Sequence, residues 1–448
     1  MLQQPQSALA HVSLRKTITV LGLATAVSVL QFCVVISISP NFSPSLSVDQ
    51  TSQNVGQFTG IREAPFGGDF LQDWVGAHIV CSEQRDQLYD LEHFKKVQHD
   101  PALVGFRWTD TRYYPPIYAP GYYLLLSPSL ALDYQSAAYV WLTFSCCCFV
   151  AATAVLYLFY PPCRRIFPWG LLLALVFCPL LDSLVIGHKS ALLFLMLTVS
   201  FVLLYRGKPF LGGLCFGLIA FKPHLAIPIC FVMLVKGNWR FAGGMLLTVL
   251  GWVSLSLVVS YDLTLQYCQA LLGNVIYVDH AGYQLESAHT VWSLGQRLFG
   301  QNISATLFAL TTSLLFVAWL IRIMSTCNNS ERRLFAYQFS AMIIVTILVS
   351  PHFYFYDLTI TLLPVLLLAS AALEGEKEKN LLIAVVGFAL LAGTFTVISH
   401  ITHIQISFVW LCVLLFLIDS RLSMIKVITL QTTPARFSGS HTLACNAD

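Results

Sequence analysis

Charged side chains are scarce in this 448-residue chain. Asp, Glu, Lys and Arg make up 10% of it, hydrophobic residues make up 56%, and the mean hydropathy is +0.71. A soluble globular protein carries roughly 25% charged residues. The shortage argues against a water-soluble protein, because too few charges remain to cover a surface that faces water. We therefore predict an all-α polytopic membrane protein.

Several chemical signatures are also missing. The 13 Cys show no CxxC or Cys/His zinc spacing, and most of them lie in apolar segments. No glycine-rich loop of the nucleotide-binding type is present. The formal net charge of +3 is too small for a nucleic-acid footprint. We expect no metal, disulfide framework, cofactor or nucleic-acid partner.

Long apolar runs recur from end to end. The first, 17–38, follows Arg15 and Lys16 and lacks a convincing cleavage site, so it is interpreted as an uncleaved anchor. Each later run is long enough, or nearly so, to cross a hydrocarbon core of roughly 30 Å as a helix. These runs are 136–160, 168–186, 190–206, 240–260, 302–324, 333–349, 355–372, 380–398 and 404–420. The sequence thus predicts a bundle of about ten spans.

The distribution of Lys and Arg predicts the orientation of the bundle. Basic residues in the short loops fall on alternate sides of the spans, and the positive-inside rule places all of them in the cytoplasm. They are Arg15/Lys16, Arg164/Arg165, Arg206/Lys208, Lys236/Arg240, Arg322/Arg332/Arg333, Lys377/Lys379 and Arg421/Lys426. We expect a multi-pass protein of the plasma (inner) membrane, with the N-terminus 1–16 and a partly disordered tail 421–448 both cytoplasmic.

The segment 210–235 lies between two of these basic loops and must enter and leave on the same side. Lys222 and Pro223 stand at its centre, where proline breaks a helix. We predict a re-entrant hairpin with Lys222 and His224 at its tip. The alternative is one kinked span, which would invert every later loop.

Two long segments then face the extracytoplasmic side, 40–135 and 262–301. The aromatic, proline-containing stretch 113–126 of the first is typical of juxtamembrane helices at the membrane interface. Tyr114 belongs to it. The second segment contains His289 and Arg297 in a stretch with amphipathic spacing, which predicts a helix over the mouth of a cavity. Its histidines and glutamate fit no standard metal motif.

Ionisable groups at the outer ends of spans are costly and indicate function. Asp69 and Asp73 are four residues apart, so in a helix they share one face. Such a pair could supply a general base for a sugar hydroxyl. Alternatively, Asp69 follows two glycines and could cap a helix.

Three basic positions are candidates for binding an anion. His188 and Lys189 form a sharp outer turn where positive charge is disfavoured; Lys222 either neutralises an anion or extends to the interface. His352 and Asp357 stand at the outer mouth of a later span. A histidine beside aromatics is often only packed, but the nearby Asp357 favours a site.

The order of these motifs resembles that of glycosyltransferase family 87, bacterial polyprenyl-phosphate-mannose-dependent mannosyltransferases of the GT-C superfamily. Asp69-Phe70, Leu88-Tyr89-Asp90, Tyr-Pro-Pro, a Gly-His turn, Lys222-Pro223 with Asn238-Trp239-Arg240, and Ser-Pro-His…Tyr-Asp carry the likeness. It covers about 17–420 and implies one GT-C-like transmembrane domain. The chain departs from the family pattern at Gly187-His188-Lys189-Ser190, where Gly-Gln-x-Asn is expected.

The resemblance implies a glycosyltransferase that moves a hexose, expected to be mannose, from a polyprenyl-phosphate donor to a glycolipid or glycan acceptor outside the membrane. Asp69 would be the base, and His352 would serve the donor phosphate or the reaction centre. Phosphate or substrate would be bound by a further set of residues: Lys222, His224, His188, Lys189, Arg297, His289, Asp73, Tyr114 and Asp357. Two alternatives stay open: a transporter or flippase of a lipid-linked or anionic solute, and a non-catalytic family member.

Overall fold

The computed structural model describes residues 67–107, 113–272, 288–325, 332–373, 378–402 and 404–432. Within these ranges every regular element is helical, apart from one isolated bridge between Ala288 and Tyr354. This confirms the predicted all-α polytopic fold. The predicted N-terminus 1–16 and first span 17–38 lie outside the described residues, as do 40–66 of the first outer segment, 273–287 of the second and 433–448 of the tail.

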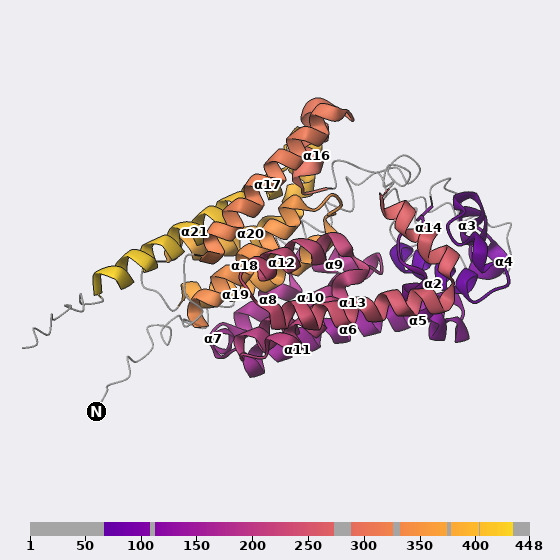
Figure 1. Cartoon of the computed structure of the whole chain (residues 1–448), viewed down its shortest axis with the longest axis horizontal. Helices are drawn as coiled ribbons and strands as arrows, with labels where there is room; N and C mark the ends of the chain where they lie inside the picture. Colours follow the sequence, from indigo (N-terminus) through magenta and orange to yellow (C-terminus); the bar gives the residue numbers. More distant parts are fainter. Residues whose placement is uncertain are drawn as a thin grey trace, which may run out of the picture.

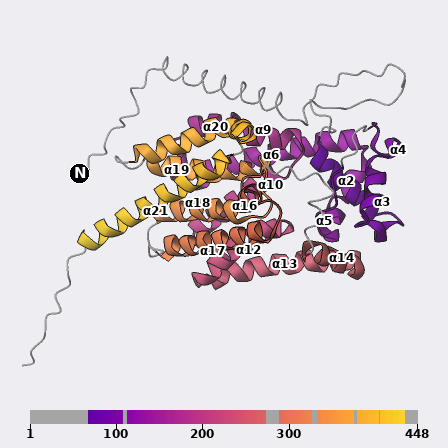
Figure 2. The same cartoon turned by 90° about the horizontal axis from the view of Figure 1, so that it is seen from above.

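The helices form an elongated bundle with a helical cap at one end. The cap contains α2 (Gly68–Val80), α3 (Leu91–Gln98), α4 (Pro101–Val104), α5 (Pro120–Leu125) and α14 (Tyr261–Leu272), which lie together in both views (Figure 1 and Figure 2). Helices are therefore present in the segments for which helices at the membrane interface were predicted. They come from the two segments assigned to the extracytoplasmic side.

Among the described residues, four helices are long and apolar enough to cross a membrane unaided: α6 (Tyr134–Phe159), α13 (Trp239–Val259), α17 (Ile303–Ser325) and residues Ile406–Lys426 of α21 (Ile406–Thr432). A fifth candidate is the helix pair α8 (Phe167–Leu175) and α9 (Cys178–Val185), which is apolar enough to cross as one broken span and is bent by 50°. The break has a local cause, because Pro179 lies in the first turn of α9 and cannot continue the hydrogen bonding of α8.

The other predicted spans form shorter apolar helices, which are α10 (Ser190–Tyr205), α18 (Arg332–Val349), η5 (Tyr356–Thr361) with α19 (Leu362–Ala372), and α20 (Lys379–Thr402). The predicted hairpin forms α11 (Pro209–Gly217) with the 3-10 turn η3 (Leu218–Phe221), and α12 (Pro223–Val235). A helix as short as α10 rises about 24 Å, less than the roughly 30 Å of a hydrocarbon core. A site at one end of α10 can therefore lie at a depth that the hydrocarbon core also occupies.

The segment 209–235 enters and leaves the bundle at the same end. A Cβ on Gly244 would lie 2.1 Å from the backbone oxygen of Phe210, and Thr248 donates a hydrogen bond of 3.0 Å to the backbone oxygen of Leu214. Further along, the rings of Phe221 and Trp252 are 6.1 Å apart. The paired residue numbers rise together, so α11 and α13 run parallel. A single kinked span would make them antiparallel, and the hairpin prediction is confirmed.

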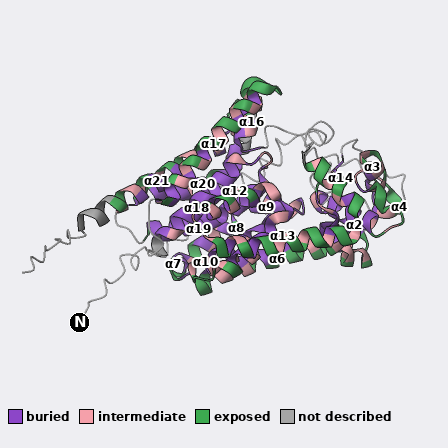
Figure 3. Cartoon of the chain, in the orientation of Figure 1, coloured by how far each residue is buried: buried purple, intermediate pink, exposed green. Residues whose placement is uncertain are grey.

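Burial separates a central core from a lipid-facing surface. Every residue of α19 is buried, which is typical of a helix that is apolar on all sides and enclosed by others. Large apolar side chains of α13 are exposed along most of its length, Val258 among them at 78% (Figure 3). In a membrane this face would contact lipid.

The end of the bundle opposite the cap is held by ion pairs. Arg421 lies 2.6 Å from Glu378, and Arg322 contacts Asp419. Both arginines belong to the set predicted to face the cytoplasm. The helix α21 continues to Thr432, past the predicted boundary at 420, so the tail expected from 421 begins as a helix.

Candidate functional site

The start of α2 is joined to the turn that follows α9. The amide of Asp69 donates a hydrogen bond of 2.9 Å to the backbone oxygen of Ile186. Gly187 has φ +71° and packs so closely that a Cβ there would lie 2.9 Å from the Cα of Gly67. Only glycine fits both the conformation and the space. This contact brings Asp69 beside His188 and Lys189, more than 100 residues later in the chain.

Asp69 does not cap α2. The N-cap is Gly67, which has no side chain, and Asp69 lies in the first turn. The capping interpretation of Asp69 is therefore wrong. Its side chain is half-buried and has no hydrogen-bond or ion-pair partner among the described residues. A carboxylate in this position is available to a substrate.

Burial raises the pKa of Asp69 to about 6. The positive charges of Lys189 and Lys222 oppose this effect, whereas the carboxylates of Asp73 and Asp357 add to it. A carboxyl group with such a pKa is mostly ionised at pH 7, yet it is a stronger base than an ordinary aspartate. Both properties suit a general base.

Asp73, one turn further along α2, is fully buried and paired. The Nζ of Lys189 lies 2.8 Å from its Oδ2, and the hydroxyl of Tyr122 donates to the same oxygen at 3.0 Å. The ammonium also lies 4.4 Å from the centre of the Tyr118 ring. Desolvation raises the pKa of Asp73 and lowers that of Lys189, while their mutual attraction opposes both shifts. The structure thus places Asp69 and Asp73 in different surroundings.

Lys222, at the hairpin tip, joins two outer segments. Its Nζ lies 2.9 Å from Oδ1 of Asp357 and 2.8 Å from Nε2 of His188. Burial, followed by the charges of Lys222 and Lys189, lowers the pKa of His188, so this imidazole is neutral and accepts from the ammonium. The Nδ1 of His188 lies 2.6 Å from the hydroxyl of Ser190 and serves there as the donor.

His352 and His224 complete this group as half-buried residues. Burial lowers the pKa of His352, the negative charge of Asp357 raises it, and Lys222 lowers it, so all three side chains are close enough to interact. The charges that act on His224 are those of Lys222 and His352. The loop that carries His352 is fixed by a hydrogen bond of 2.8 Å from the hydroxyl of Ser350 to the backbone oxygen of His352.

Most of the predicted residues therefore meet at one place. We define the polar cluster as this group: Asp69, Asp73, His188, Lys189, Lys222, His224, His352 and Asp357. Tyr114 adjoins it, because a Cβ on Gly68 would lie 2.6 Å from the Tyr114 hydroxyl.

His289 lies beside the loop that carries His352, and Arg297 lies close enough to His289 to affect its pKa. The amide of His289 donates 2.9 Å to the backbone oxygen of Phe353, and its ring contacts the Ser407 hydroxyl. Burial and the positive charge of Arg297 lower the pKa of His289 to about 3. Arg297 is in α16 (Val291–Phe299). These contacts indicate that His289 supports the loop of His352.

Three tyrosines of the site were not expected from the sequence. Tyr118 and Tyr122 enclose Lys189, and the ring of Tyr356 lies 4.3 Å from that of His188. Tyr356 directly precedes Asp357 in the Tyr-Asp motif, so the sequence did contain a signal that this tyrosine belongs to the site. Tyr118 and Tyr122 lie in an apolar stretch that is typical of a membrane interface, and only the tertiary fold shows that they cover a charge.

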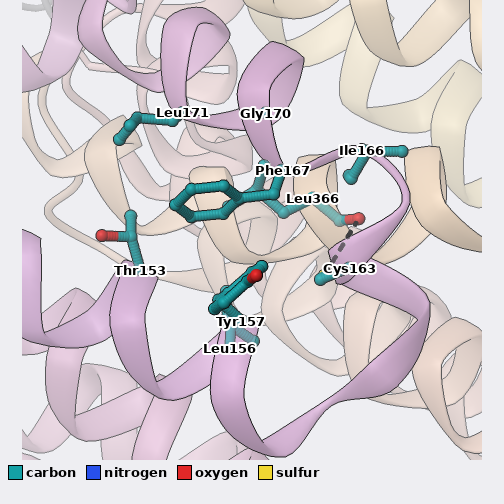
Figure 4. Close-up of a pocket in the computed structure, with 9 residues that line it drawn as sticks. All are labelled: Thr153, Leu156, Tyr157, Cys163, Ile166, Phe167, Gly170, Leu171 and Leu366. Atoms are coloured by element: carbon teal, nitrogen blue, oxygen red, sulfur yellow. Dashed lines mark hydrogen bonds between the residues drawn. The ribbon is translucent and has the colours of Figure 1, made fainter.

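A recess lies at the end of α6 away from the polar cluster. It is lined by apolar atoms almost throughout, between α6, α7 (Pro161–Arg164), α8 and α19 (Figure 4). At one side of it the thiol of Cys163 lies 3.9 Å from the backbone oxygen of Leu366 (Figure 4). No ionisable pair of the polar cluster takes part, so we place the functional site at the capped end of the bundle.

The family model described as Glycosyltransferase family 87 matches residues 117–351. Comparison with curated proteins and with solved structures finds no match. The matched segment contains Lys189 and Lys222 and ends one residue before His352, while Asp69 lies outside it and is joined to it by the contacts above. Because the match spans more than half of the 448 residues, the chain belongs to glycosyltransferase family 87 and is a membrane glycosyltransferase.

Proposed function

We propose that this glycosyltransferase moves a hexose, mannose being the expected one, from a polyprenyl-phosphate-linked donor to an acceptor hydroxyl, with inversion at the anomeric carbon and Asp69 as general base. The observation that carries the proposal is the state of Asp69. Its carboxylate is half-buried and has no partner among the described residues, and burial raises its pKa to about 6 against the opposing charges of Lys189 and Lys222. An acceptor hydroxyl needs a carboxylate of this kind to take up its proton.

The reaction has two requirements. The acceptor oxygen forms a bond to the anomeric carbon while its proton passes to the Asp69 carboxylate. On the opposite face, the bond from that carbon to the phosphate oxygen breaks, and the electron pair leaves with the polyprenyl phosphate. A base and a cationic site for the leaving group must therefore flank the same space.

Lys222 is suited to the leaving phosphate. An ammonium has three N–H groups, and two of those on Lys222 point to His188 and Asp357. No further partner of Lys222 is found among the described residues, so one N–H remains for a phosphate oxygen. The imidazoles of His352 and His224 are half-buried nearby and offer additional N–H donors.

The depth of the cluster supports a lipid-linked donor. Phe221, next to Lys222, packs against Trp252, which is 13 residues into α13 and 7 residues from its end. At about 1.5 Å per residue, the hairpin tip is then roughly 10 Å short of the outer end of α13. A phosphate carried by a polyprenol would lie near this depth.

The distribution of basic residues supports an extracytoplasmic site and a GT-C-like topology. The loops that carry Arg206 and Lys208, and Lys236 and Arg240, are at the end of the bundle away from Lys222, since α10, α11 and α12 connect the two levels. By the positive-inside rule that far end is cytoplasmic. The polar cluster then faces the compartment that contains glycolipid and glycan acceptors.

A reconstituted assay tests the proposal. Purified protein in liposomes is supplied with radiolabelled polyprenyl-phospho-mannose and a panel of glycolipid and glycan acceptors, with other polyprenyl-phospho-hexoses as competitors. Wild type should transfer sugar, and Asp69→Asn should lose at least a thousandfold in rate while it still binds the donor. Asp86→Asn, an exposed acid in the same outer segment, is the matched control and should be fully active.

Two results would overturn the proposal. Equal turnover by Asp69→Asn would remove Asp69 from the base role. Donor that crosses the bilayer without sugar transfer would indicate the transporter or flippase alternative instead.

A further inference from the structure

Two opposite charges are buried one helical turn from Asp69. The exposed fraction of both the Lys189 and the Asp73 side chain is 0%, and the two are 2.8 Å apart. Charges are seldom taken out of water without a strong reason, because desolvation can exceed the attraction between them. A pair of leucines would pack the same space at less cost, so the pair calls for a functional explanation.

The surroundings of Lys189 exclude direct contact with a substrate. Its ammonium lies 4.4 Å from the centre of the Tyr118 ring and 5.8 Å from that of Tyr122, whose hydroxyl closes over Asp73. The Tyr122 ring in turn packs on Phe221 at 5.3 Å, which joins this enclosure to the hairpin tip. A donor phosphate cannot reach Lys189 unless these rings move. Lys189 can nevertheless act on the site through its charge.

The groups that face Asp69 come from four elements. Lys189 comes from the turn before α10, Lys222 from the hairpin tip, Asp73 from α2 and Asp357 from η5. Three phenols also lie within electrostatic range of Asp69: Tyr118, Tyr134 and Tyr356. Among the cations of the described residues, Lys222 is bonded to Asp357 and has one N–H for the phosphate, so Lys189 is the cation near Asp69 that is withdrawn from substrate.

We propose that Lys189 is a positioning residue: held against Asp73 beneath the tyrosines, it keeps Asp69 ionised and thereby sets the lower pH limit of sugar transfer. This inference rests on the proposed role of Asp69 as base.

Two variants should affect Asp69 to different extents. Lys189→Met removes the attraction that favours the Asp69 carboxylate and leaves the negative charge of Asp73, which disfavours that carboxylate, without its counter-charge. The midpoint of Asp69 titration should then rise by roughly one pH unit, the usual effect of one close charge. In Lys189→Met/Asp73→Asn the opposing influences of both partners on Asp69 disappear together. The midpoint should return to within a few tenths of a unit of wild type.

The titration can be measured without any donor. A hydrophobic carbodiimide reacts with protonated carboxyl groups, and peptide mass spectrometry with fragmentation separates labelling at Asp69 from labelling at Asp73. The pH dependence of labelling gives the Asp69 midpoint for purified wild type, Lys189→Met, the double variant and Lys208→Met. The last removes an exposed lysine at the other end of α10 and should leave the midpoint unchanged.

The acid limb of the transfer rate is then measured for the same four proteins. The inference predicts that the rate and the labelling shift together in Lys189→Met, and that the double variant restores both. An Asp69 midpoint that stays at the wild-type value in Lys189→Met, or one that rises equally in the double variant, would overturn it. A wild-type protein that shows the labelling shifts but no sugar transfer would count against the proposed function and leave the electrostatic relation between Lys189 and Asp69 standing.

Discussion

The ammonium of Lys222 lies 2.9 Å from Oδ1 of Asp357, although 135 residues separate them in the chain. The contact joins the hairpin tip to the start of η5 and so fixes the two segments that carry His224 and His352. Asp357 is held in turn, because its Oδ2 accepts a hydrogen bond of 3.1 Å from the amide of Tyr354. The pair therefore has both a structural role and a chemical role, and variants can separate the two.

Removing one partner of this pair should cost both stability and activity. Lys222→Met leaves Asp357 buried without its cation, which typically costs about 3–5 kcal/mol, and it removes the N–H assigned to the donor phosphate. In Lys222→Met/Asp357→Asn the buried charge is gone. We expect thermal stability in detergent to recover in the double variant while donor affinity stays at least tenfold weaker than in wild type. Recovery of both would assign Lys222 a purely structural role.

The rate of transfer should fall in acid with a midpoint near pH 6. Asp69 has a pKa of about 6, so below that pH its carboxyl group is protonated and cannot accept the hydroxyl proton. A plot of log kcat/KM against pH should have unit slope on its acid side. The measurement is made at saturating acceptor in liposomes stable across pH 5–8. An acid limb near pH 4 would show that the base is an ordinary exposed carboxylate.

The same pKa predicts that Asp69 lowers stability at neutral pH. The group has a pKa of 3.8 when unfolded and about 6 when folded, so the folded state binds its proton more tightly. Its favourable contribution is present below about pH 4 and is lost as pH rises through 6, a difference of up to about 3 kcal/mol. Asp69→Asn should therefore melt at a higher temperature than wild type at pH 8 and at nearly the same temperature at pH 4. A lower melting temperature of the variant at pH 8 would contradict the assigned pKa.

Several parts of this arrangement could be predicted from the sequence, because charge is so rare in it. Asp69, Lys222 and His352 stand out in apolar surroundings, and basic loops on both sides of 210–235 require the hairpin. The pairing of Lys189 with Asp73 could not be predicted. Spacing places Asp73 on the face of Asp69, but its partner depends on how α2 meets the turn after α9, which is a tertiary contact. The bend between α8 and α9 was missed for a related reason, since hydropathy alone does not distinguish a broken span from a straight one.

Tyr356 should contribute to substrate binding through its hydroxyl. The ring packs at 4.3 Å against His188, and no hydrogen-bond partner for the hydroxyl is found in the part of the chain that the structure describes. Tyr356→Phe preserves the ring and removes only the hydroxyl. We expect kcat/KM to fall about tenfold, the usual effect of one lost hydrogen bond, with an unchanged melting temperature. Tyr261→Phe, in the exposed part of α14, is the control.

The close approach of α11 to α13 should set the position of the hairpin tip. A Cβ on Gly244 would lie 2.1 Å from the backbone oxygen of Phe210, whereas its neighbour Gly243 has nothing within 4 Å. Gly244→Ala must therefore push α11 away, and Lys222 with it, so we expect lower stability and at least a tenfold loss of transfer. Gly243→Ala adds the same methyl group to the same helix without a clash and should be neutral or stabilising by up to about 1 kcal/mol. Equal behaviour of the two variants would mean that α11 does not depend on this contact. A loss confined to Gly244→Ala would show that packing in the bundle holds the phosphate site in place.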